Sequence, residues 1–136
     1  MKNQILHYHA LNTDLGSLML RLIFGGLFIY YGYNKVISYD AILPQFPDLI
    51  GIGSKTSFIL VIFAELVCGF FVAIGFLTRL SVIPIFITMI VAYFIAHAKD
   101  PFDAKQIAFV YLLLSIVIFV LGSGKFSVDK LLFKQS

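Results

Sequence analysis

Four long apolar stretches, separated by short polar segments, make up most of this chain. They lie at residues 15–36, 57–77, 80–97 and 105–122, and each falls within the roughly 17–25 residues that a helix needs to cross a bilayer. Asn12 and Asp14 precede the first stretch as helix-capping residues, and Pro101 ends the third. The alternating polarity over about ten residues that a membrane β-strand needs is missing. The pattern predicts an all-α polytopic membrane protein, an antiparallel four-helix transmembrane bundle that forms a single domain over residues 1–136.

The longest connection, residues 38–55, mixes polar residues with Phe46, Leu49 and Ile52. We expect an interfacial loop that lies on the membrane or caps the bundle, and the alternative is a loop packed by its own side chains. Four crossings place both termini on one side, and a slight excess of Lys and Arg there favours cytoplasmic termini. That side carries Lys2, Arg79, Lys125, Lys130 and Lys134, and the other carries Lys35, Lys55, Lys99 and Lys105.

The composition agrees with a membrane protein. Hydrophobic residues make up 60% and charged residues 12% of the chain, against about 45–50% and about 25% in a soluble domain. The net charge of +3 comes from dispersed lysines, so we expect no nucleic-acid partner, which would need a clustered basic face. Cys68 is the only cysteine, which excludes an intrachain disulfide and a CxxC redox pair. His7 and His9 lack nearby carboxylates, so we expect no metal site.

Two charged residues fall well inside the apolar stretches, away from their ends. Glu65 lies in the middle of "LVIFAELVCGFFVAIGF", residues 60–76, and Arg21 lies a few residues inside the first stretch. Such residues are costly in hydrocarbon and usually face the bundle interior. Helical spacing places both on stripes that contain small residues, so we expect them to point inward and the glycines to allow close packing. The expected packing glycines are Gly25, Gly32 and Gly69.

A direct ion pair between Arg21 and Glu65 would have to span a long distance. The two residues lie at different depths, and their side chains lean apart because the helices run in opposite directions. A bridging water, a hydroxyl or a ligand head group is an equal alternative. As a direct pair, they would act as a folding lock that sets helix register.

Polar aromatic residues gather at the opposite ends of the spans. Tyr30 ends the first stretch, Tyr93 and His97 end the third, and Tyr111 opens the fourth. Tyr is the ordinary residue of the membrane interface, and this is the simpler interpretation. The alternative is the mouth of a cavity that leads to Glu65 and holds a quinone head group or carries protons, because His97 can titrate near neutral pH.

Four pieces of the chain resemble the DoxX family of small four-span membrane proteins. They are "RLIFGGLFIYYGYNK" (21–35), "AELVCGFFVAIGFLTRL" (64–80), "MIVAYFIAH" (89–97) and "GSGKFSVD" (122–129). The resemblance implies a location in the bacterial inner membrane. It also points to family members associated with thiosulfate:quinone oxidation, and to others grouped with thiol and superoxide defence proteins. The polar positions that match the family are Arg21, Lys35, Glu65, Arg79 and His97.

Two classes of function follow. The favoured hypothesis is a non-catalytic scaffold or partner subunit of a membrane complex, or a lipid-binding bundle. The alternative is a quinone-interacting subunit of a membrane oxidoreductase system, and a small transporter is a weaker third. We expect no intrinsic cofactor, and a quinone is the candidate ligand. The expected partners are membrane lipids and another protein of a membrane complex. Whether the chain is an enzyme or a homo-oligomer is left open.

Overall fold

The computed structural model describes residues 6, 8–48 and 50–133, and within them four helical spans are long and apolar enough to cross a membrane. The all-α prediction and the four crossings are confirmed, and the ends of the spans differ from the predicted ones by a few residues. Lys2, His7, Leu49 and Lys134 lie outside the described residues. The spans are α1 (Thr13–Ile37), the run of α3 (Ser54–Ile62), η3 (Phe63–Cys68) and α4 (Gly69–Ile74), the run of α5 (Thr78–Val91) and η4 (Ala92–Ala96), and α6 (Phe102–Leu121).

Local chemistry sets the ends of the spans. The Asn12 side chain accepts a hydrogen bond from the Leu15 amide at 3.0 Å and caps α1. Gly75, at φ +76°, ends α4 in the left-handed conformation that glycine adopts without steric cost. Two segments, η3 and η4, are π-helical, with a wider turn that is rare and often found at functional sites. One π-helical segment contains Glu65 and the other ends just before His97.

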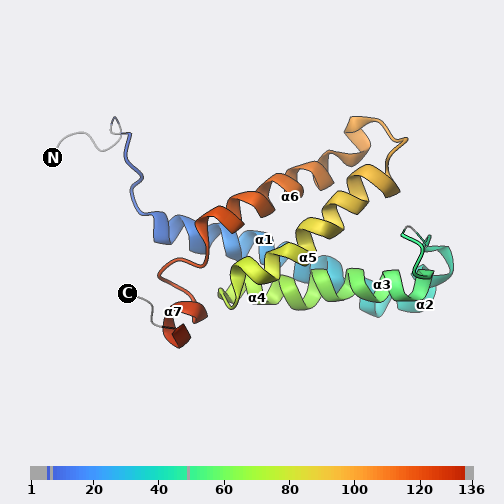
Figure 1. Ribbon diagram of the computed structural model, residues 1–136, viewed down its shortest axis with the longest axis horizontal. Helices are drawn as coiled ribbons and strands as arrows, with labels where there is room; N and C mark the ends of the chain where they lie inside the picture. Colours follow the sequence, from blue (N-terminus) through green and yellow to red (C-terminus); the bar gives the residue numbers. More distant parts are fainter. Residues whose placement is uncertain (1–5, 7, 49, 134–136) are drawn as a thin grey trace.

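The spans form two antiparallel pairs. The closest packing is between α1 and α4 and between α5 and α6. Figure 1 shows α5 and α6 running together away from α1 and α3, so that the two pairs lie close together near α4 and apart near α2 (Tyr39–Ile42). The beginning of α1 and the short helix α7 (Val128–Phe133) lie toward the end where the pairs meet (Figure 1). The predicted tyrosine mouth belongs to the opposite, divergent end.

Glycines allow the first pair to approach closely. A Cβ on Gly25 would lie 2.5 Å from the carbonyl oxygen of Gly69 and 2.8 Å from the Ala73 amide nitrogen, closer than real atoms come. A Cβ on Gly32 would lie 2.8 Å from the amide nitrogen of Leu66. The α1 backbone therefore touches the backbone of the second span at two levels, as small residues permit in membrane helices.

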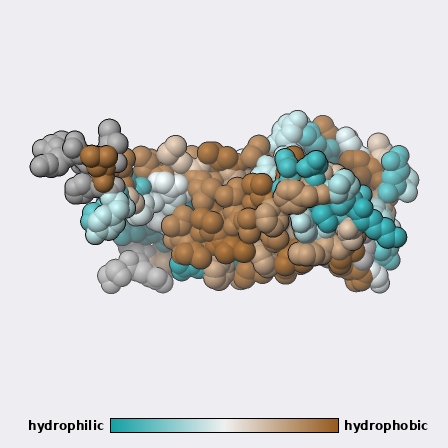
Figure 2. Space-filling view, turned by 90° about the horizontal axis from the view of Figure 1, so that it is seen from above, coloured by the Kyte–Doolittle hydropathy of each residue, from teal (hydrophilic) through white to brown (hydrophobic). Residues whose placement is uncertain are grey.

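A small core fills the middle, and the outer surface is apolar. Figure 2 shows a broad hydrophobic area over the centre of one face, with hydrophilic residues gathered toward one end. Only 17–39% of each span's most apolar window is buried within the chain, so most apolar side chains face outward, as they do toward lipid. The largest fully buried apolar side chains are Phe24, Phe28, Phe58, Val72, Val82, Ile85 and Ile118.

The connection at 38–55 folds onto the second span. It forms α2 and the 3₁₀ turn η2 (Leu43–Gln45), and its Tyr39 and Phe46 rings lie 5.3 and 4.9 Å from the buried Phe58 ring. Asp48 accepts hydrogen bonds from the amides of Gly51 and Gly53 and holds the return turn. The loop thus covers the beginning of α3 through aromatic contacts.

Candidate functional site

An ion pair between Lys35 and Glu65 lies at the centre of the site. Lys35 Nζ is 2.8 Å from Glu65 Oε1, and the lysine side chain is 27% and the glutamate side chain 8% exposed. Lys35 belongs to the last turn of α1, where a cation is favoured by the helix dipole, and Glu65 belongs to η3. The pair joins the first span to the second at the end where the two helix pairs diverge.

Arg21 does not take part in this pair. Its guanidinium donates to the carbonyl oxygens of Ala73 at 3.0 Å, Val72 at 3.4 Å and Phe126. The first two carbonyls belong to the last turn of α4, where backbone acceptors have no helical partner. The direct Arg21–Glu65 pair, and the folding lock built on it, are therefore wrong.

The reason for this correction is depth. Arg21 and Lys35 are on the same helix fourteen residues apart, which corresponds to about 21 Å along the axis. Because Lys35 contacts Glu65, Arg21 lies near the opposite end of the bundle. The long Lys35 side chain reaches inward from the helix end, which is ordinary behaviour for lysine near a membrane surface.

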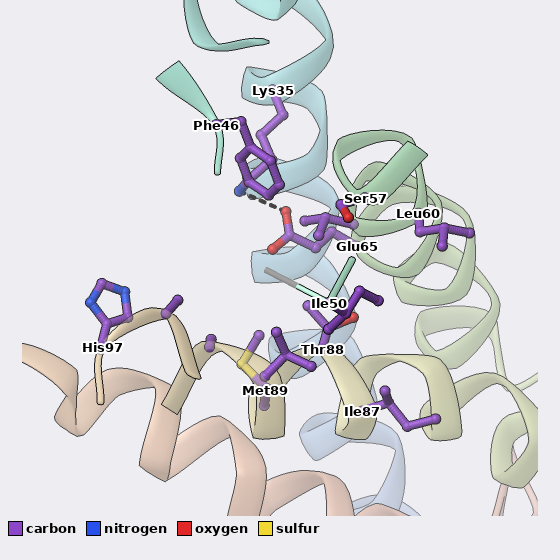
Figure 3. A pocket seen from close by; sticks show the side chains of 14 residues that line it. Lys35, Phe46, Ile50, Ser57, Leu60, Glu65, Ile87, Thr88, Met89 and His97 are labelled. Carbon is purple, nitrogen blue, oxygen red and sulfur yellow. Dashed lines mark ion pairs between the residues drawn. The ribbon is translucent and has the colours of Figure 1, made fainter. Parts of the chain in front are cut away.

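A cavity of about 340 Å³ opens beside the ion pair. Two buried polar side chains stand in its wall: Ser57 Oγ has no hydrogen-bond partner among the described residues, and Glu65 Oε1 is paired with the Lys35 ammonium. Glu65 and Ser57 are each only 6% exposed. Figure 3 shows Ser57 beside Glu65, with Lys35 and Phe46 on the same side of the space.

The remaining wall of this cavity is apolar. Ile87 and Met89 of α5 line the side opposite the ion pair (Figure 3), and Thr88 is satisfied by donating to the Pro84 carbonyl at 2.8 Å. Leu60 and Ile87 line the cavity and are 49% and 55% exposed. The cavity therefore reaches the apolar outer surface between α3 and α5.

His97 stands at the edge of the site. Its Nδ1 lies 2.7 Å from Asp100 Oδ2, and both side chains are nearly half exposed. His97 lines the cavity described above and also a second cavity of about 230 Å³, which lies on the α6 side of the ion pair. Figure 3 shows its ring well apart from the ion pair. The predicted imidazole is thus at the mouth of the site and not in contact with Glu65.

The predicted tyrosines take different positions. The Tyr111 hydroxyl is 3.3 Å from that of Tyr31, and both residues line the second cavity. Tyr93 lies under the Lys105 ammonium, which is 4.4 Å from the ring centroid. Tyr30 is exposed on the outer surface of α1. Only Tyr111 of the predicted three therefore lines the space beside Glu65.

Arg79 belongs to the other end of the bundle. Its Nε donates to the Phe119 carbonyl at 2.8 Å and one terminal nitrogen donates to Val120 at 3.2 Å, so it caps the end of α6. Asp129 lies at the same end and accepts hydrogen bonds from the backbone amides of Leu77 and Thr78 at the start of α5. Arg21 and Arg79 each donate to backbone carbonyl oxygens at the end of a helix, and both are remote from the cavity.

Sequence reasoning missed two residues of the site. Ser57 lies eight residues before Glu65, which is the helical spacing that places both on one face. Met89 lines both cavities, but the sequence pointed to it only as part of an apolar span and of the family-like piece 89–97. Within the described residues, no group of three or more His, Cys, Asp or Glu side chains is arranged to hold a metal ion.

The comparisons with known proteins agree with this architecture. The DoxX family profile matches residues 16–98. The chain is 30% identical over 122 residues to the Bacillus subtilis (strain 168) protein named "Putative oxidoreductase CatD", a match that covers 89% of this chain and 90% of the relative. No solved structure matches the chain.

Proposed function

This chain belongs to the DoxX family, and from that premise we propose that it is a non-catalytic membrane subunit that binds a lipophilic molecule with a hydrogen-bonding head group. The observation that carries the proposal is the buried Ser57 hydroxyl, whose Oγ lacks a hydrogen-bond partner among the described residues and lies beside Glu65 in the wall of a mostly apolar cavity. Leaving such an atom unpaired costs about 1–3 kcal/mol. A ligand head group would remove that cost.

The cavity suits the head of an amphipathic molecule. Binding pockets for small molecules are usually apolar, about 300–1,000 Å³ in volume, and orient the ligand with a few polar groups. Here Lys35 and Ser57 supply donors and Glu65 supplies an acceptor. An apolar tail would leave through the surface between Leu60 and Ile87 and join the lipid chains.

A quinone is the second candidate ligand, and the name of the Bacillus subtilis relative favours it. Quinone carbonyl oxygens accept hydrogen bonds, and the Ser57 hydroxyl and the Lys35 ammonium are donors on the cavity wall. Cys68 is buried and is the only cysteine, so a protein partner would supply the electrons. In this version the chain is the quinone-holding part of an oxidoreductase complex.

The proposal includes a location. We place the protein in the bacterial inner membrane with both termini in the cytoplasm. The helix ends tied by Arg21 and Arg79 then face the cytoplasm, and the cavity faces the outer leaflet. The weak excess of basic residues on the terminal side supports this orientation.

The test is to purify the chain with its native lipids and identify bound molecules by mass spectrometry. We expect a lipid or quinone at one molecule per chain, reduced in Ser57→Ala and Glu65→Gln. Ser115→Ala is the matched control, because Ser115 is buried but donates to the Leu112 carbonyl at 2.6 Å, away from the cavity. A preparation without a bound molecule, or equal retention in all variants, would contradict the proposal.

A further inference from the structure

The Lys35–Glu65 pair separates two cavities. The first, of about 340 Å³, lies between α3 and α5, and the second, of about 230 Å³, lies between α1, η4 and α6. Four residues line both: Lys35, Glu65, Met89 and His97. The carboxylate of Glu65 is therefore in the wall of two spaces at once.

The two cavities differ in their surroundings. The first reaches the surface at Leu60 and Ile87, which lie within the membrane spans. The second has exposed lining residues at His97 and Ala104, beside the polar segment 97–101 that joins η4 to α6, and at Ile107 of α6. Both cavities meet the polar end of the bundle at His97. The first also opens toward lipid at Leu60 and Ile87, whereas the polar lining of the second leads toward the segment 97–101.

The second cavity is suited to hold water. A water molecule needs about 10–15 Å³ of free volume and two to four polar partners. Polar residues that line this cavity are Tyr31, Tyr111, Lys35, Lys105 and His97. The Lys35 ammonium contacts Glu65, and the Lys105 ammonium lies over the Tyr93 ring. The five lining residues come from α1, α6 and the end of η4, so polar partners surround the space on three sides.

We propose that Glu65 exchanges protons with the aqueous phase on the His97 side through this second cavity, while its other face contacts the ligand in the first. A hydronium ion in the cavity transfers its proton to a carboxylate oxygen, an O–H bond forms on Glu65 and the hydronium becomes water. Release is the reverse. This proton route depends on the proposed function in one respect only: the bound ligand is the reason for moving the proton.

Cysteine accessibility tests the water route without any ligand. The background is Cys68→Ala, and the two variants are Ala108→Cys in the second cavity and Ala92→Cys in the first; both alanines are half-buried. A charged methanethiosulfonate reagent is added to one side of sealed vesicles. Because the reagent needs a hydrated thiolate, we expect Ala108→Cys to react at least about tenfold faster than Ala92→Cys, and from the His97 side only. Equal rates, or reaction from the opposite side, would overturn the proposal.

Infrared spectroscopy tests proton exchange at Glu65 itself. The carboxylic-acid band that disappears in Glu65→Gln should shift in D₂O, and Ala108→Phe should slow that shift at least about tenfold by filling the second cavity. Ala41→Phe is the matched control, because Ala41 is exposed and lines neither cavity, and it should leave the rate unchanged. An unchanged rate in Ala108→Phe would overturn the route. If a bound molecule still copurifies, the proposed function stands and only the route is lost.

Discussion

Lys35 Nζ lies 2.8 Å from Glu65 Oε1, so the last turn of the first span is joined to the middle of the second by a mostly buried ion pair. The pair compensates a carboxylate that hydrocarbon alone would not tolerate. The same two side chains line the cavity of the proposed ligand. In that proposal, stability and binding depend on one pair of residues.

The ion pair gives the first prediction. Lys35→Met leaves Glu65 buried without its partner, and we expect the free energy of unfolding in detergent to fall by about 3 kcal/mol. The double variant Lys35→Met with Glu65→Leu should recover most of that loss, because no buried charge remains. Thermal unfolding of the four proteins of the cycle measures the coupling, which should exceed about 1 kcal/mol.

The matched cycle uses Arg21→Met with Glu65→Leu. The two residues contact different partners, so their effects should add within about 0.5 kcal/mol. Strong coupling between positions 21 and 65 would contradict the assignment of Glu65 to Lys35.

The second prediction concerns the close approach of α1 and α4. Gly25→Ala places a Cβ 2.5 Å from the Gly69 carbonyl oxygen, so the helices must separate, at a cost of about 1–3 kcal/mol. Gly26→Ala is the matched control, because nothing lies within 4 Å of its added Cβ. Helix propensity alone should make Gly26→Ala neutral or slightly stabilising. Equal melting temperatures for the two variants would show that the helices do not touch at Gly25.

The third prediction concerns Arg21. Arg21→Met removes the guanidinium that joins Ala73 of α4 to Phe126 of the C-terminal segment. We expect faster amide hydrogen exchange at residues 122–133 and a loss of about 1.5–3 kcal/mol, typical of hydrogen bonds to a charged group. Arg79→Met is the comparison: its contacts are solvent-exposed and involve only α6, so exchange in the same segment should change less. Faster exchange in Arg79→Met than in Arg21→Met would show that Arg79 holds this segment more than Arg21 does.

The fourth prediction concerns Asp129 in the short helix α7 (Val128–Phe133). Its carboxylate accepts from the Leu77 amide at 2.7 Å and the Thr78 amide at 3.3 Å, so it caps α5 from a distant part of the chain. Asp129→Ala should lower the unfolding free energy by about 0.5–2 kcal/mol, as loss of a helix cap does. Asp40→Ala, at an exposed carboxylate in α2, should have little effect. Thermal unfolding in detergent compares the two, and similar losses would argue against the cap.

The spans were predictable because their signal is local. A run of apolar residues the length of a bilayer identifies a helix without knowledge of its neighbours, and the asparagine and glycine signals at its ends are equally local. The inward direction expected of Glu65 also followed from helical spacing. The π-helical turn that holds Glu65 was not predictable, since no residue pattern in "FAELVC" distinguishes it from α-helix.

The pairing of charges was not predictable for a different reason. It depends on how the spans are staggered and on the reach of each side chain, and neither appears in one sequence. The depth difference between Arg21 and Glu65 already argued against a direct pair. Lys35 was among the predicted polar positions, but its pairing with Glu65 was not predicted. Ser57 was overlooked because a serine in an apolar helix gives no signal until the wall of a cavity is seen.

The two helix pairs are fastened at one end and divergent at the other. At the meeting end, Arg21 and Ser17 of α1 donate to the carbonyl oxygens of Phe126 and Gly122, which follow α6. At the far end, the Lys35–Glu65 pair stays within the first helix pair, and the Tyr31 and Tyr111 hydroxyls meet across the two pairs. Both cavities have walls from both helix pairs, so a change in the angle between the pairs would alter the two volumes together.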